Sequence, residues 1–79
     1  MLTDYIAAAM RHMACEQLPD DDTWYCEIPD LPGVWSNAPT LDEAHAELQD
    51  VLEAWIALGL ARHEAIPAID GVEIAVQAV

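Results

Sequence analysis

The sequence predicts an α+β fold: a short N-terminal helix, then a β-β-β-α-β order, with one mostly antiparallel sheet covered on one face by a long helix. Three observations predict it. Two β-friendly segments flank the acidic turn "PDDD" at residues 19–22, an apolar stripe at helical spacing follows residue 40, and "VEIAV" at residues 72–76 alternates like a strand. The length of 79 residues suits a single domain, 1–79.

The first half of the chain predicts one helix and three short strands. Thr3 can cap a helix that begins at Asp4, because a threonine hydroxyl accepts hydrogen bonds from the first free amides. Loose alternation over residues 11–18 predicts the first strand, and the aromatic-rich residues 23–28 predict the second. Residues 34–36 predict a short third strand.

The two cysteines fall at opposed positions of the predicted hairpin. With the turn centred between Asp20 and Asp21, Cys15 faces Cys26 in an antiparallel pair, within the reach of a disulfide. The N-terminus lacks the basic region of a secretory signal, which indicates a cytoplasmic, reducing location. We therefore expect free thiols whose side chains point into the core under the long helix.

A compact turn and a helix start follow the hairpin. Pro29 ends the second strand because proline cannot donate a ladder hydrogen bond, and Gly33 can adopt a positive φ. Thr40 as N-cap and Glu43 at the third helical position form a capping box.

The long helix is predicted from residue 41 to about residue 60, where Gly59 is one candidate end. Its apolar stripe consists of Leu41, Ala44, Leu48, Val51, Leu52, Trp55 and Leu58. The strand at residues 72–76 then returns after a helical crossover. It should lie parallel to a neighbour through a right-handed connection.

The charge balance restricts the partners. Fifteen acidic residues oppose two arginines, giving a net charge of -13. Anionic nucleic acids and membrane surfaces should be repelled, so we expect neither as a partner. A basic protein is favoured by charge steering, although acidity could also serve only to keep a small apolar chain in solution. The 54% apolar content in so short a chain also predicts a homodimer or a higher homo-oligomer.

No residue pattern in the chain indicates catalysis, a metal site or a cofactor. The acidic turn and Asp30 offer carboxylates, but aspartates are favoured in turns for local backbone reasons. His12 has no nucleophile in a defined motif beside it, and we interpret it as structural. Trp24, Trp35 and Trp55 are interpreted as core residues, unless one is exposed and serves as a binding anchor.

Residues 24–44, "WYCEIPDLPGVWSNAPTLDEA", resemble the sequence core of the HicB-type antitoxin family. The matching positions are those of the turn and the helix start: Pro29, Asp30, Leu31, Pro32, Gly33, Thr40, Glu43 and Ala44. Ile66 and Pro67 fall where such proteins carry an Ile-Pro after the long helix. The chain departs from the pattern at residues 38–39, which are Ala-Pro rather than the family's Gly-Asp, and in having no C-terminal DNA-binding segment.

The resemblance implies a partial ribonuclease H-like fold without catalytic carboxylates. It also implies a type II antitoxin that covers the active site of a small basic HicA-type, mRNA-cleaving toxin. The residues that we expect to contact such a partner are acidic or aromatic: Asp20, Asp21, Asp22, Glu27, Asp30 and Trp35. The alternative is a solitary relative without a toxin, acting as a homo-oligomeric scaffold or a small-ligand binder. An enzyme is the third and least supported hypothesis.

Overall fold

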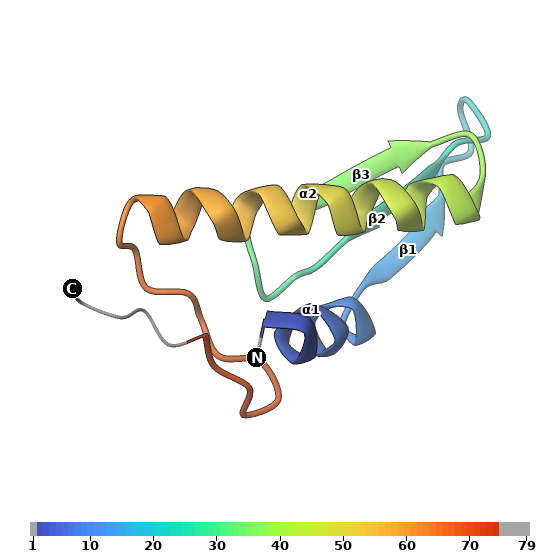
Figure 1. Cartoon of the computed structure of the whole chain (residues 1–79). Coiled ribbons are helices and arrows are strands. Elements are labelled where there is room, and N and C mark those ends of the chain that lie inside the picture. Colours follow the sequence, from blue (N-terminus) through green and yellow to red (C-terminus); the bar gives the residue numbers. More distant parts are fainter. Residues whose placement is uncertain (1, 75–79) are drawn as a thin grey trace.

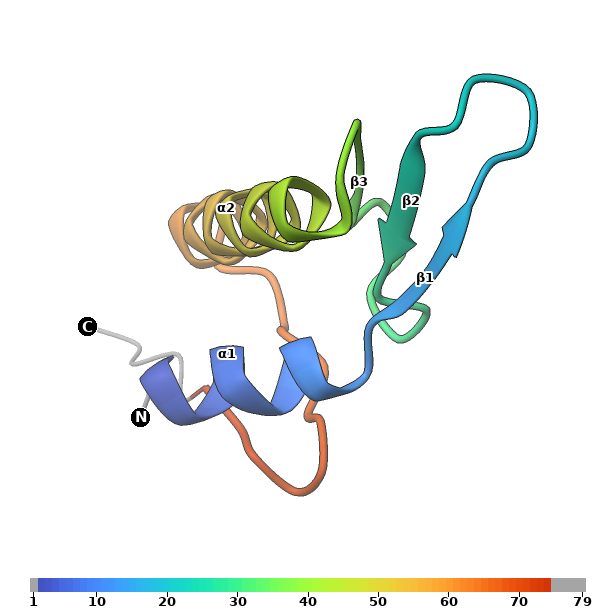
Figure 2. The same cartoon turned by 90° about the vertical axis from the view of Figure 1, so that its right-hand side faces the viewer.

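The computed structural model describes residues 2–74 and has both helices on one side of a small sheet (Figures 1 and 2). The elements are α1 (Leu2–Arg11), β1 (Ala14–Gln17), β2 (Trp24–Glu27), β3 (Trp35–Ala38) and α2 (Leu41–Ala61). The strands pair antiparallel in the order β1-β2-β3. The predicted α+β fold, with a long helix across one face of an antiparallel sheet, is confirmed.

The β1–β2 hairpin has the predicted register. Cys15 pairs with Cys26, and Gln17 pairs with Trp24. The turn between the strands is closed by the amide of Leu18, which donates to the Thr23 carbonyl at 2.7 Å. Asp22 has a φ of 55°, a left-handed conformation that aspartate tolerates better than most residues, so the acidic turn has a local backbone role.

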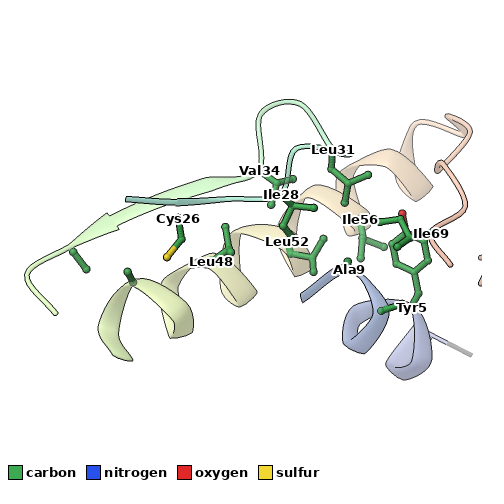
Figure 3. Packing of buried hydrophobic residues seen from close by; sticks show 13 residues of the cluster. Tyr5, Ala9, Cys26, Ile28, Leu31, Val34, Leu48, Leu52, Ile56 and Ile69 are labelled. Atoms are coloured by element: carbon green, nitrogen blue, oxygen red, sulfur yellow. The ribbon is translucent and has the colours of Figure 1, made fainter. Parts of the chain in front are cut away.

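The Pro-Asp-Leu-Pro-Gly turn places one leucine in the core. The Leu31 amide donates to the Ile28 carbonyl at 2.9 Å, and the Val34 amide donates to the Leu31 carbonyl at 3.1 Å. These two successive turns bury Leu31 completely, and Gly33 takes a φ of 95° that a residue with a Cβ rarely adopts. Figure 3 shows Leu31 and Val34 with Ile28 on the side of α2 that carries Leu52 and Ile56, so the turn is a packing element between sheet and helix.

Helix α2 begins as the capping box predicts. The Glu43 amide donates to the Thr40 hydroxyl at 3.2 Å, and Thr40 has an extended backbone. The buried residues on α2 are Ala44, Leu48, Leu52, Ile56 and Gly59. The predicted stripe is therefore wrong at its two ends: Leu41 is 42% exposed and Leu58 is 50% exposed. The buried residues of α2 are four positions apart from Ala44 to Ile56. A helix has only 3.6 residues per turn, so the next residue on the core side is three positions further on, at Gly59, and Leu58 faces away from the core.

The segment after α2 folds back onto α1. The Tyr5 hydroxyl donates to the Pro67 carbonyl at 2.6 Å, and Ile69 is buried beside it in the core (Figure 3). Gly59 lies inside α2 rather than at its end. A Cβ at this position would lie 2.7 Å from the Ile66 side chain, so the glycine admits the returning segment.

Several predicted boundaries differ from the structure: β2 is one residue shorter at each end than residues 23–28, and β3 is Trp35–Ala38 rather than residues 34–36. The first helix includes Thr3, which therefore does not cap it, and extends to Arg11, so β1 is shorter than predicted. The amides of His12 and Met13 still donate to the carbonyls of Ala9 and Met10 at the end of α1, so strand pairing begins only at Ala14. The predicted last strand is also wrong over residues 72–74, where Val72 only bridges to Ile69 across a tight turn; residues 75 and 76 lie outside the described residues.

Cys15 and Cys26 form a disulfide, so the expectation of free thiols is wrong. Their Cα atoms lie 4.1 Å apart, as the predicted register implied. Cys26 is buried, whereas Cys15 is only half-buried because α2 packs on β2 and β3 and not on the edge strand β1. The disulfide therefore links the edge strand β1 to β2, on which α2 packs.

We predict that Thr40→Ala lowers the free energy of unfolding by about 1 kcal/mol, because the Glu43 amide loses its hydroxyl acceptor. Urea unfolding followed by circular dichroism measures this. Thr40→Ser keeps the hydroxyl and should remain within about 0.5 kcal/mol of the parent chain. Equal losses in the two variants would contradict a capping role.

We predict that reducing the Cys15–Cys26 disulfide lowers the free energy of unfolding by about 3 kcal/mol, because the loop between two residues 11 apart in sequence is no longer closed in the unfolded chain. Urea unfolding with and without a reductant tests this. The double variant Cys15→Ala/Cys26→Ala is the control, and its stability should not respond to the reductant. An equal response in both proteins would show that the effect does not come from this bond.

Candidate functional site

The sheet has one covered and one uncovered face. Strand alternation directs Cys26 and Ser36 toward α2, and the Ser36 hydroxyl donates to the Ala44 carbonyl at 2.7 Å. The opposite face, which we call the open sheet face, carries Ala14, Glu16, Tyr25, Glu27, Trp35 and Asn37. Because both helices lie on the other side (Figure 2), no described element packs over this face.

An aromatic pair occupies the centre of the open sheet face. Tyr25 and Trp35 stack with ring centroids 6.0 Å apart and an angle of 27° between the planes, and Trp35 is 52% exposed. The Tyr25 hydroxyl donates to Glu27 Oε2 at 3.2 Å. A shallow hollow of about 220 Å³ lies beside the pair, lined by Ala14, Cys15, Glu16, Tyr25 and Glu27. The face thus combines a large exposed ring with a preorganised acidic rim.

The electrostatics of this face favour a cationic partner. Partial burial raises the pKa of Tyr25, and the hydrogen bond to Glu27 and the negative charges of Glu27 and Glu16 raise it further. The tyrosine therefore keeps its proton at neutral pH and remains a donor. Two carboxylates, an indole edge and a phenol are the groups that a lysine- or arginine-bearing surface can contact.

The structure brings together two of the predicted partner-contacting residues. Glu27 and Trp35 are paired across β2 and β3 and both lie on the open sheet face. The predicted contacts missed Glu16 and Tyr25, although strict alternation around Glu27 would have placed both beside it.

The other predicted partner residues lie at the two ends of the sheet. Asp20, Asp21 and Asp22 are in the turn between β1 and β2. Asp21 accepts hydrogen bonds from the Thr23 hydroxyl at 2.7 Å and the Thr23 amide at 3.2 Å, which lowers the pKa of Asp21. Asp30 lies beyond the other end of β2, where its carboxylate contacts His12, so it is separated from the acidic turn by the length of the strand.

Asp30 belongs to a cluster around His12. His12 Nδ1 lies 3.1 Å from Asp30 Oδ2, and His12 Nε2 lies 2.8 Å from Asp70 Oδ1. The Arg11 guanidinium is 3.9 Å from the second Asp70 oxygen. The hydrogen bond to Asp70, with the negative charges of Asp70 and Asp30, outweighs desolvation and raises the pKa of His12. His12 thus joins the end of α1 to two turns that are distant in sequence, which confirms a structural contact for this residue.

The described residues do not meet the requirements of a metal site or of a membrane-spanning helix. Over residues 2–74, no three side chains of His, Cys, Asp or Glu gather in an arrangement that could hold a metal ion. The same residues contain no helix with both the length and the apolar character needed to cross a membrane.

The chain belongs to the UPF0150-like family, which it matches over residues 4–67. It is also similar to the crystal structure of TTHA0281 from Thermus thermophilus. The two chains are 40% identical with a TM-score of 0.91, over 98% of this chain and 95% of that one. No curated protein matches the chain. The family match includes residues 24–44, and the resemblance of this stretch to HicB-type antitoxins stays a prediction.

We predict that the pH dependence of stability reports the His12 cluster. The pKa of His12 is raised in the folded state, so the stabilisation is fully present below the ordinary value of 6.5 and is lost as the pH rises through the folded-state pKa. Nuclear magnetic resonance titration of the His12 ring, with urea unfolding at each pH, measures both quantities. Asp70→Asn should bring the His12 pKa down toward 6.5.

His12→Gln is the control for this prediction and should remove the part of the pH dependence that lies above pH 6.5. His63 is exposed and is the matched residue, because His63→Gln removes a histidine outside the cluster. A His12 ring that titrates at or below 6.5 in the parent chain would contradict the raised pKa.

Proposed function

We propose that this chain is a protein-binding module of the antitoxin kind, whose open sheet face covers a small basic protein. The single observation that carries the proposal is the half-exposed Trp35, which stacks on Tyr25 and pairs with Glu27, while Glu16 pairs with Tyr25 on its other side. An exposed tryptophan held in place by a neighbouring ring is typical of the anchor residues that dominate protein interfaces.

Charge supports a basic partner over other classes. The net charge of -13 steers a cationic protein toward the chain and repels nucleic acid. The carboxylates of Glu16 and Glu27 line the hollow beside Tyr25, so a basic partner finds charge attraction and aromatic contact on the same face. A second acidic copy of the chain would meet like charges here.

The resemblance of residues 24–44 to HicB-type antitoxins supports the toxin-neutralising form of this proposal. The partner is then a HicA-type toxin, and the turn and capping box serve to hold the sheet against α2. Leu31, buried within the turn, is consistent with this scaffold role.

Small-ligand binding is a second candidate, favoured by one observation. A hollow of about 230 Å³ lies between the two helices, lined by Leu2, Ile6, Glu53, Ile56, Ala57 and Leu60. Its walls are apolar except for Glu53, so it suits a small apolar ligand. Changes in the Ile6 and Ile56 methyl signals on addition of such a ligand would support this candidate over the protein-binding one.

The first test is whether a gene for a small basic protein neighbours the gene of this chain, because its absence would contradict the antitoxin proposal. Where it is present, that protein is expressed alone and together with the chain. We predict growth arrest by the basic protein alone and rescue by co-expression. Purified components should form a complex that salt weakens, because counterions screen the charge attraction. A neighbouring basic protein that neither arrests growth nor binds the chain would contradict the antitoxin proposal.

Two charge-reversal variants locate the interface. Glu16→Lys should weaken binding by at least about tenfold, because it places a like charge beside the anchor. Glu47→Lys changes the net charge equally on an exposed position of α2 and should weaken binding less than about threefold. Equal effects would mean that only the overall charge matters. Trp35→Ala should be at least as damaging as Glu16→Lys while leaving the fold intact by circular dichroism.

A further inference from the structure

The two halves of α2 differ in charge. Residues 42–53 carry Asp42, Glu43, Glu47, Asp50 and Glu53, whereas residues 54–61 carry no charged side chain. Part of the uncharged half is exposed to solvent. Its solvent-facing residues are Ala54, Ala57, Leu58 and Ala61, spaced so that they form one line along the helix, which we call the outer stripe. Leu58 at its centre is 50% exposed.

Apolar surface continues beside the outer stripe. Ala57 also lines the hollow between α1 and α2, where Ile6 and Leu60 form the walls. Leu2, at the end of α1, is 48% exposed at the same hollow. The apolar region therefore extends over two helices and is larger than isolated exposed side chains would produce.

We infer that a second copy of this chain covers the outer stripe, and that the protein is a dimer through antiparallel contact of the two α2 helices. With a net charge of -13, two copies repel each other wherever acidic surfaces meet. The uncharged half of α2 is where two copies can touch without burying carboxylates. A basic partner has no electrostatic reason to choose this surface, because its attraction is directed to Glu16 and Glu27.

The order of residues along the helix selects the antiparallel arrangement. A two-fold axis between Ala57 and Leu58 opposes these two residues and sets Ala54 against Ala61, whose small side chains permit close approach. Glu53 of one copy then lies at the same height along the interface as Arg62 of the other. A parallel arrangement would instead align Glu53 of one copy with Glu53 of the other.

Arg62 is available for such an approach. Its side chain is 64% exposed, and its guanidinium lies 3.9 Å from the Glu64 carboxylate on the same surface. The outer stripe lies on the side of α2 away from the sheet, so dimerisation leaves the open sheet face uncovered (Figure 2). This inference therefore stands independently of the proposed function.

Sedimentation velocity over a wide range of concentrations tests the inference on the full chain. We expect a dimer in the parent chain and a dimer dissociation constant raised at least about tenfold in Leu58→Glu, because a carboxylate would be buried at the contact. Ala46→Glu is the matched control. It adds the same charge on an exposed position in the acidic half of α2 and should leave the dissociation constant within about threefold of the parent value.

Each other outcome overturns the inference. A parent chain that is monomeric at every concentration excludes the dimer, and a dimer unaffected by Leu58→Glu places its contact elsewhere. Equal weakening by both variants would show that total charge, not the outer stripe, controls association.

Cysteine cross-linking tests the register separately. Both native cysteines are in the Cys15–Cys26 disulfide, so an introduced cysteine is the free thiol. Ala54→Cys and Ala61→Cys should cross-link to each other when the two variants are mixed under mild oxidation, and neither should cross-link to its own copy. Cross-links between identical copies, or a dimer by sedimentation without the mixed cross-link, would overturn the antiparallel register.

Discussion

Packing of α2 against one face of the sheet is the constraint on which the rest of the structure depends. Helix α2 approaches the sheet closely at a small residue, Ala44, whose carbonyl accepts a hydrogen bond from the buried Ser36 hydroxyl at 2.7 Å. With α2 seated on β2 and β3, and α1 on the same side, the chain has no element left among its described residues for the opposite face. The aromatic residues that favour strand formation at that face, Tyr25 and Trp35, therefore remain accessible to a partner.

Local patterns in the sequence predicted the parts of the fold that depend on neighbouring residues. The opposed cysteines and the Thr40 cap follow from turn and helix geometry over a few residues. Contacts between distant segments were not predictable in this way. His12, Asp30 and Asp70 are brought together by the fold, and no periodicity in the sequence relates them. Only the alternation of β2 and β1 could have placed Tyr25 and Glu16 in the candidate site.

Two expectations from the sequence, the free thiols and the apolar stripe of α2, were wrong for physical reasons. The thiol expectation rested on a cellular compartment, while the bond depends on a register that had been predicted correctly. The apolar stripe of α2 was extended past the point where 3.6 residues per turn rotates Leu58 away from the core. That second error is informative, because an apolar residue that the core does not use needs another explanation at the surface.

The open sheet face and the outer stripe differ in charge, and this separates their responses to salt. Binding of a basic protein to Glu16 and Glu27 gains from unscreened attraction, so added salt weakens it. Association of two chains of charge -13 through the uncharged half of α2 would be opposed by long-range repulsion, so added salt should strengthen it. A basic partner bound to the open sheet face also neutralises part of that repulsion. If both proposed contacts form, occupation of one surface would therefore favour occupation of the other through charge alone, without any change in conformation.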